Sequence, residues 1–290
     1  MVMEIQFIPE RLTENLDKVK YSCLLEYCKN LNGQLVSSKV KYEDLKADKV
    51  FNTLDSGLLE ELLKIEEEKF GNIRQESNIH ETTNEVIKTI NDYMSHGRIL
   101  GETCGLPGSG KTTFTSKHFP NNYICIDAEI KKVYENYDFS NLDYNESRRR
   151  QEGLRNQIEK NITQRLINDS IIIDTLYNLK TYRQENFERI KEYNSTSICF
   201  MFDSHSQTCH ERMAFRRKTS ETQVYHLSSL IYFLLSFESP LSKELTPELG
   251  IDLILTINKE GTIMSGYPYE NYELLKEQKI IPHKGWNYWN

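Results

Sequence analysis

Two spacings of hydrophobic positions divide the chain near residue 95. Before this point, apolar residues recur every three or four positions, as on one face of a helix, in stretches at 12–27, 58–63 and 86–94. After it, short apolar runs alternate with helix-like stretches. Such alternation predicts a parallel sheet covered by helices on both faces. We therefore expect a helical accessory region over residues 1–95 and an α/β domain over residues 96–290.

Five apolar runs are expected to form a mainly parallel, five-stranded sheet. They read RILGETCGL from Arg98, YICIDA from Tyr123, SIIIDTL from Ser170, SICFMFDS from Ser197 and IDLILTI from Ile251. Glu102 lies in the middle of the first run, where a buried parallel strand is normally apolar, so it should face a polar partner or an exposed edge. The aromatic tail from Ser265 could pack across the sheet or offer rings that stack on a base.

Composition and cysteine spacing indicate a cytoplasmic protein. No apolar run reaches the length that spans a membrane, and the first residues lack the basic, apolar and small-residue pattern of a signal peptide. The six cysteines form no Cys-x-x-Cys pair, which favours reduced thiols. We expect no membrane partner.

The charge balance limits the class of partner. A formal net charge of -7 argues against a protein that coats nucleic acid through bulk electrostatics. Any polyanion would have to bind at a local basic patch. The arginine run 148–150 is one candidate, and a solvated helix face balanced by Glu146 and Glu152 is the other interpretation.

A glycine-rich segment carries the strongest chemical signal. Residues Gly105 to Thr112 match the pattern G-x-x-x-x-G-K-[ST], with an expected strand before it and an expected helix after it. In this motif the backbone N–H groups surround phosphate oxygens, Lys111 reaches the β- and γ-phosphates, and the Thr112 hydroxyl binds Mg²⁺. We expect ATP and Mg²⁺ as cofactors. The predicted nucleotide-binding residues are Gly105, Pro107, Gly108, Ser109, Gly110, Lys111, Thr112 and Thr113.

The rest of the sequence argues against two other classes of nucleotide-binding protein. GTPases read guanine with Asn-Lys-x-Asp, but the nearest run, at residues 258–261, has Gly261 in place of the aspartate. Motor ATPases usually place a glutamate after the aspartate of the second signature strand, where this chain has Thr175 after Asp174. With no obvious residue to activate water, phosphoryl transfer to a bound hydroxyl is favoured.

Two aspartates and two arginines are candidates for the transfer chemistry. Asp127 ends an expected strand, where it could accept the proton of an incoming hydroxyl or simply cap the next helix. Asp174 ends the next buried run, where it could hold Mg²⁺, orient the acceptor or be structural. Arg212 and Arg216 are four residues apart, so they share a helical face and could clamp the γ-phosphate as a lid; a solvated charge run is the alternative.

Four segments in order resemble one kinase family. GLPGSGKTTF, ICIDAE, IIIDTLYNLKTYR and CHERMAFR, within about residues 98–217, are similar to the kinase domain of phage polynucleotide kinases. The relatives of that family include phage kinases that phosphorylate 5-hydroxymethyluracil in DNA and, more distantly, the zeta-toxin sugar-nucleotide kinases. The resemblance implies that Asp127 is the general base and that Arg212 and Arg216 are lid arginines. Asp174 with Asn178 resembles the family's Asp-x-x-Asn-like stretch after the third strand, although the family usually spaces these two residues more closely.

The chain departs from that family at the acceptor side. Polynucleotide kinases typically carry an aspartate directly after the base and an arginine three residues on, where this chain has Ala128 and Ile130. Lys131 and Lys132 could compensate. The departure makes a hydroxyl on a base more attractive than a 5′-OH end.

These observations lead to one favoured function and two alternatives. The favoured one is an ATP-dependent kinase that acts on a nucleic-acid hydroxyl, preferably the hydroxymethyl group of 5-hydroxymethyluracil in phage DNA, with a polynucleotide 5′-OH close behind. Such a protein would work in the host cytoplasm. The acidic net charge favours the first alternative, a small-molecule kinase for a nucleoside or sugar nucleotide. The second is a nucleotide-dependent binding protein that uses residues 1–95 as an interaction module.

Overall fold

The computed structural model describes somewhat more than half of the chain. The described residues are 63–71, 77–126, 128–129, 132, 144–174, 180–181, 183–184, 195–203, 205–219, 230, 233–234, 237–242, 247–248 and 250–281. They fall into two compact units. The first holds the helix at 63–71, the loop residues Leu106–Ser109 and the described residues from 205 to 239; the second holds the sheet and the helices that cover it. The apolar stripe at 12–27 and nearly all of the stripe at 58–63 lie outside the described residues.

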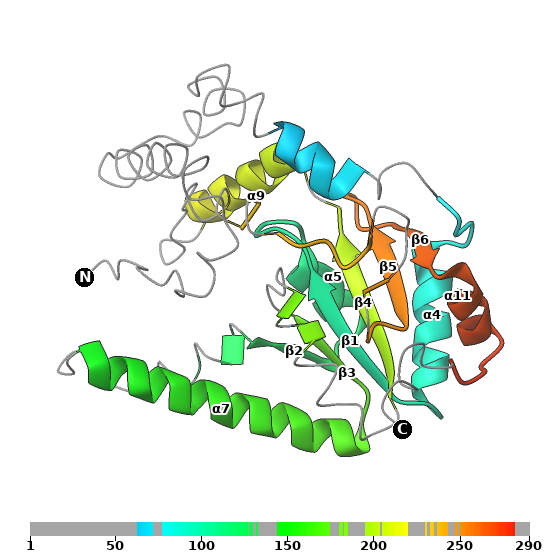
Figure 1. The fold of residues 1–290 in the computed structure, drawn as a ribbon, viewed down its shortest axis with the longest axis horizontal. Coiled ribbons are helices and arrows are strands. Elements are labelled where there is room, and N and C mark those ends of the chain that lie inside the picture. Colours follow the sequence, from blue (N-terminus) through cyan, green and yellow to red (C-terminus); the bar gives the residue numbers. More distant parts are fainter. Residues whose placement is uncertain are drawn as a thin grey trace. The chain divides into compact units, whose positions relative to one another are not determined.

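A six-stranded, mostly parallel sheet forms the second unit (Figure 1). Its strands are β1 (Ile99–Cys104), β2 (Tyr123–Cys125), β3 (Ile171–Asp174), β4 (Thr196–Phe202), β5 (Leu253–Ile257) and β6 (Ile263–Tyr267). They lie in the order β2-β3-β1-β4-β5-β6, and only the β5–β6 pair is antiparallel. The predicted α/β fold is confirmed, with six strands instead of five.

The strand missed from the sequence is β6, at one edge of the sheet. It mixes apolar with small and polar residues, so it lacks the continuous apolar run of the buried parallel strands. A tight turn connects it to β5, and the side-chain oxygen of Asn258 accepts the backbone N–H groups of Glu260 and Thr262 there. The run that most resembled a guanine-reading motif is therefore the turn of a β-hairpin.

Five helices have described bounds. They are α4 (Thr83–Met94), α5 (Lys111–His118), α7 (Tyr144–Asn168), α9 (Ser206–Thr219) and α11 (Tyr269–Lys276). The first four occur where the hydrophobic pattern predicted helix. At the start of α4, the Thr82 hydroxyl accepts the N–H of Glu85 while the Glu85 carboxylate accepts the N–H of Thr82, which is a capping box. None of the helices in the described part of the chain is long and apolar enough to cross a membrane.

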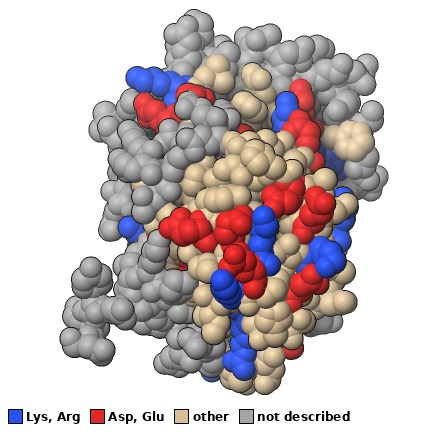
Figure 2. Space-filling model, turned by 90° about the vertical axis from the view of Figure 1, so that its right-hand side faces the viewer, with Lys and Arg blue, Asp and Glu red and all other residues tan. Residues whose placement is uncertain are grey.

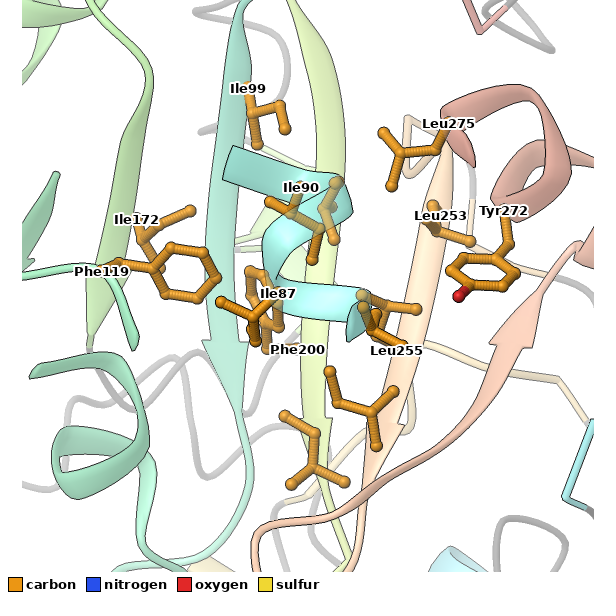
Figure 3. Packing of buried hydrophobic residues seen from close by; sticks show 14 of the residues in the cluster. Ile87, Ile90, Ile99, Phe119, Ile172, Phe200, Leu253, Leu255, Tyr272 and Leu275 are labelled. Carbon is orange, nitrogen blue, oxygen red and sulfur yellow. The ribbon is translucent and has the colours of Figure 1, made fainter. Parts of the chain in front are cut away.

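One hydrophobic cluster joins the sheet to α4 and α11 (Figure 3). Ile87 and Ile90 of α4 lie over Phe200, while Tyr272 and Leu275 of α11 pack beside β5. The third apolar stripe of the sequence is thus part of the sheet's core, although the domain boundary placed near residue 95 stays a prediction. The described beginning of the aromatic tail packs on the sheet, and residues 282–290 lie outside the described residues.

Glu102 is fully buried in the central strand β1. An exposed edge, one of the two expected explanations, is therefore wrong. Glu102 pairs in register with Cys199 of β4, away from the hydrophobic cluster, which contains Ile99 and Phe200. Among the described residues, Cys104, Cys125, Cys199 and Cys209 form no disulfide bond.

Candidate nucleotide-binding and phosphoryl-transfer site

The glycine-rich loop connects β1 to α5. Gly105, Gly108 and Gly110 have φ angles of 148°, 83° and 103°, which residues with a side chain rarely adopt. Within the loop, the N–H of Ser109 donates to the Leu106 carbonyl at 3.1 Å. Gly110 ends the loop as the N-cap of α5 in the left-handed conformation. The glycines therefore let the backbone turn between a strand and a helix within six residues.

The start of α5 presents cationic and N–H groups. Lys111 is buried, and its ammonium group donates to the Gly105 carbonyl at 2.9 Å. Thr112 and Thr113 follow in the first turn and are exposed. The first N–H groups of a helix have no partner inside it, and its N-terminus carries partial positive charge. This is the expected arrangement for holding phosphate.

Asp174 lies at the end of β3, directly beside β1 in the sheet. Its side chain is buried, and the Thr103 hydroxyl donates to Oδ1 at 3.3 Å. The other oxygen, Oδ2, is also buried and has no hydrogen-bond partner among the described residues. A buried carboxylate oxygen normally requires a donor or a cation. Asp174 and the exposed Thr112 hydroxyl therefore fit the pair of oxygen ligands that hold Mg²⁺ in proteins with this loop.

Asp127, the predicted base, lies outside the described residues. The strand before it is described: Cys125, the last residue of β2, pairs in register with Asp174. The two strands are parallel, so their carboxyl ends meet at the same edge of the sheet. The role of Asp127 stays a prediction.

Helix α9 packs on the first half of the loop. A Cβ atom added at Gly108 would lie 2.6 Å from the Cys209 carbonyl oxygen and 3.0 Å from Met213 Cγ. From the same helix, Arg212 Nη1 donates to the Ser109 carbonyl at 3.0 Å and approaches the Gly108 carbonyl at 3.4 Å. One of the two predicted lid arginines therefore contacts the phosphate loop itself.

Arg216, the second predicted lid arginine, lies one turn further along α9 and is exposed. Its role as a clamp stays a prediction. Cys209 and His210 are both fully buried in α9. No group of three metal-binding side chains occurs in the described part of the chain.

A buried ion pair that no sequence pattern predicted lies beside the residue that precedes the loop. The guanidinium of Arg183, fully buried, binds the Glu248 carboxylate at 2.6 Å and lies 3.8 Å from Cys104 Sγ, the residue before Gly105. Burial opposes the charge of Arg183, yet the neighbouring Cys104 and Glu248 raise its pKa. Burial also opposes ionisation of Cys104, but a hydrogen bond with Cys199 and the charge of Arg183 lower its pKa. Arg183 lies in a polar, helix-like stretch, where no local pattern distinguishes it from a solvated arginine.

Comparison with known proteins supports the class of domain. The sequence model of a family described as an AAA domain matches residues 100–238, a stretch that begins in β1 and includes the loop and α9. The match agrees with the α/β P-loop fold of this part of the chain. No curated protein matches the chain in sequence.

Several solved structures are similar to this chain in fold. A protein provisionally described as a kinase, from Chloroflexus aurantiacus, is 17% identical, with 56% of this chain and 89% of that chain covered and a TM-score of 0.38. A protein of the PezAT toxin–antitoxin system of Streptococcus pneumoniae is 13% identical (68% and 89% covered, TM-score 0.40). A gluconokinase from Sinorhizobium meliloti is 16% identical (63% and 89% covered, TM-score 0.33). Similarity at this level does not identify the acceptor of the phosphate.

Proposed function

We propose that the protein is a Mg²⁺-dependent kinase that transfers the γ-phosphoryl group of ATP to the hydroxyl of a small molecule. The observation that carries this proposal is the pairing of two features on neighbouring strands. β1 leads into a complete phosphate loop with a buried lysine. β3 ends in a buried aspartate, of which one oxygen accepts a hydrogen bond from Thr103 and the other has no partner among the described residues. Thr175 follows that aspartate, where a water-activating glutamate would favour hydrolysis.

Each site residue has a defined task in such a reaction. The N–H groups of the loop and Lys111 bind the β- and γ-phosphates, and Arg212 adds positive charge beside the loop carbonyls. Thr112 and Asp174 would hold the Mg²⁺, which neutralises charge on the phosphate oxygens when it is bound. A bond forms between the acceptor oxygen and the γ-phosphorus while the bond to the β-phosphate bridging oxygen breaks. In this proposal the hydroxyl proton goes to the Asp127 carboxylate.

Charge supports a small acceptor. The chain carries 43 acidic and 36 basic residues, which gives the formal net charge of -7 and disfavours a large polyanionic substrate. On the face that contains α4 and α11, acidic and basic side chains are intermixed (Figure 2), with ion pairs such as Lys276 with Glu81 and Lys88 with Asp92. No large basic patch is visible among the residues described on that face.

A nucleic-acid hydroxyl is the second candidate acceptor. The observation that favours it is a basic run near the beginning of α7, in which Arg149 and Arg150 are exposed. The candidate includes the 5-hydroxymethyluracil group that the sequence resemblance favours. A base in duplex DNA would have to be flipped out or presented as a single strand.

The test is a transfer assay with γ-labelled ATP and parallel acceptors. The panel contains nucleosides, sugar nucleotides, sugars, 5′-OH oligonucleotides, RNA ends and 5-hydroxymethyluracil DNA, and Lys111→Ala is the control for nucleotide-dependent transfer. Faster labelling of a free small molecule than of any oligonucleotide supports the proposal, and the opposite order supports the second candidate. ATP binding without label on any acceptor would reject the kinase assignment. Wild-type transfer by Asp127→Asn would remove that residue as the base.

A further inference from the structure

A buried carboxylate from the helix at 63–71 binds the start of α9. Glu66 is 2% exposed, and its Oε2 accepts the backbone N–H of Ser206 at 2.9 Å and the Ser206 hydroxyl at 2.5 Å. Its other oxygen, Oε1, lies 3.0 Å from Nδ1 of His205. An ionised carboxylate is stable at a buried position only with several donors of this kind.

Helix α9 depends on such a group because its own sequence supplies a poor cap. The His205 carbonyl accepts the N–H of Cys209 at 2.9 Å, so His205 occupies the N-cap position. Histidine is not among the residues whose side chains cap helices well, which are Ser, Thr, Asp and Asn. Glu66 lies 140 residues before Ser206 in the chain and provides the missing acceptor. As an anion, it also stabilises the positive end of the helix dipole.

The helix that carries Glu66 has a second attachment within the same unit. The Lys69 ammonium group donates to the Phe237 carbonyl, and the Phe70 ring stacks on the Phe237 ring with 4.5 Å between their centroids. Burial lowers the pKa of Lys69. Figure 1 shows this helix, in blue, adjoining α9, in yellow. The helix that carries Glu66 is therefore anchored at a second point, on Phe237.

Further along its length, α9 contacts the phosphate loop. Arg212 follows Ser206 by six residues, which corresponds to about 9 Å along a helix axis. Cys209 lies between them, and its carbonyl is packed against Gly108. Because two turns of a helix move nearly as a rigid rod, a change at the Glu66 end displaces Arg212 relative to the Ser109 carbonyl.

We propose that Glu66 is a positioning residue for Arg212. By capping α9, Glu66 fixes the position of Arg212 on the phosphate loop and thereby the affinity and reactivity of the bound nucleotide. Glu66 belongs to the predicted helical region 1–95. The inference rests on the proposed kinase function. It assigns a task to a region whose sequence carries no catalytic motif.

The test is a double-mutant cycle in the full-length protein. Glu66→Gln keeps the shape of the side chain but removes its charge and one acceptor, and Glu68→Gln makes the same change at an exposed position of the same helix. We measure kcat/KM for transfer and the Kd of a non-hydrolysable ATP analogue for wild type, Glu66→Gln, Arg212→Ala and the double variant. A small misplacement of a catalytic group costs up to about 100-fold in rate, so Glu66→Gln should lose about 10- to 100-fold in kcat/KM.

The coupling between the two sites decides the outcome. If Glu66 acts through Arg212, the Glu66→Gln change costs less than about twofold once Arg212 is alanine, and Glu68→Gln has no effect in either background. If the losses of Glu66→Gln and Arg212→Ala add fully in the double variant, the inference is overturned, because a purely structural role of Glu66 does not depend on Arg212. If Glu66→Gln does not fold, Ser206→Ala removes one of the three contacts and should show a smaller loss with the same coupling; an additive loss there would overturn the inference as well.

Failure of the proposed function has a different signature. If the wild type transfers phosphate to no acceptor but the two residues remain coupled in the Kd of the ATP analogue, the kinase assignment fails and the positioning role stands. If transfer is normal and the losses add, the kinase assignment stands and the positioning role fails.

Discussion

Replacing Gly108 with alanine should disrupt the nucleotide site, although the loop motif does not specify this position. In G-x-x-x-x-G-K-[ST], residue 108 is one of the four unrestricted positions. In the folded protein its φ is 83°, and an added Cβ would lie 2.6 Å from the Cys209 carbonyl oxygen. A backbone atom of a helix cannot rotate away as a side chain can. Either α9 or the loop must therefore move.

The size of the effect follows from two costs. The left-handed conformation costs a non-glycine residue about 1–2 kcal/mol. Overpacking a tight contact costs about 1–3 kcal/mol more, so the free energy of unfolding should fall by about 2–5 kcal/mol. The shift would also separate Arg212 from the Ser109 carbonyl. A displaced loop would also lose hydrogen bonds to the phosphates, and one bond to a charged group contributes about 1.5–3 kcal/mol, which corresponds to about a 10- to 100-fold loss in nucleotide affinity.

The assay is urea unfolding together with ATP titration. Gly153→Ala in α7 is the matched control, because a Cβ there would meet no atom within 4 Å. That substitution should raise the free energy of unfolding by about 0.5–1 kcal/mol, as alanine is favoured over glycine inside a helix. A Gly108→Ala protein within about 0.5 kcal/mol of wild type and with unchanged ATP affinity would refute the reasoning.

Three further predictions concern other described residues. Asp174→Ala should raise the Mg²⁺ concentration for half-maximal transfer by at least about tenfold, and an unchanged Mg²⁺ titration would exclude this residue as a ligand. Arg183→Met leaves the Glu248 carboxylate buried without its cation and should cost about 3–5 kcal/mol in urea unfolding, with partial recovery when Glu248 is also replaced by leucine; a loss below about 1 kcal/mol would contradict this. Burial and the nearby Lys117 lower the pKa of His118 below 6.5, so the folded protein favours the neutral imidazole. The contribution of the neutral imidazole to the free energy of unfolding is complete above about pH 6.5 and is lost as the pH falls through the folded pKa. His118→Gln should flatten the plot of the free energy of unfolding against pH in this range. An unaltered slope would assign the pH dependence to another group.

Hydrophobic spacing predicted most of the sheet because burial on both faces leaves a continuous apolar run. β3 and β4 are buried along their whole length, and both were visible as such runs. β6 was not, because an antiparallel edge strand tolerates small and polar residues such as Ser265 and Gly266. The helix α4 was predicted as a helix, but its periodicity could not show that its apolar face packs on the sheet.

For the candidate site, the sequence was informative where residues lie in one segment or at the ends of predicted strands. The loop and its lysine form one continuous segment, and Asp174 could be selected because parallel strands end at a common edge. The arginine pair on α9 was selected by spacing alone, and the structure distinguishes its members: Arg212 contacts the loop carbonyls, whereas Arg216 is exposed.

The sequence by itself determined the P-loop α/β fold and predicted a site for a nucleoside triphosphate, because hydrophobic periodicity and glycine spacing depend on residues that are neighbours in the chain. Only the tertiary structure decided that Gly108 has no room beside α9, that Arg183 is paired with Glu248, and that Glu66 caps a helix that begins 140 residues later. Each of these contacts joins residues far apart in the chain. Their energies come from burial and directed hydrogen bonds, which exist only after the chain has folded.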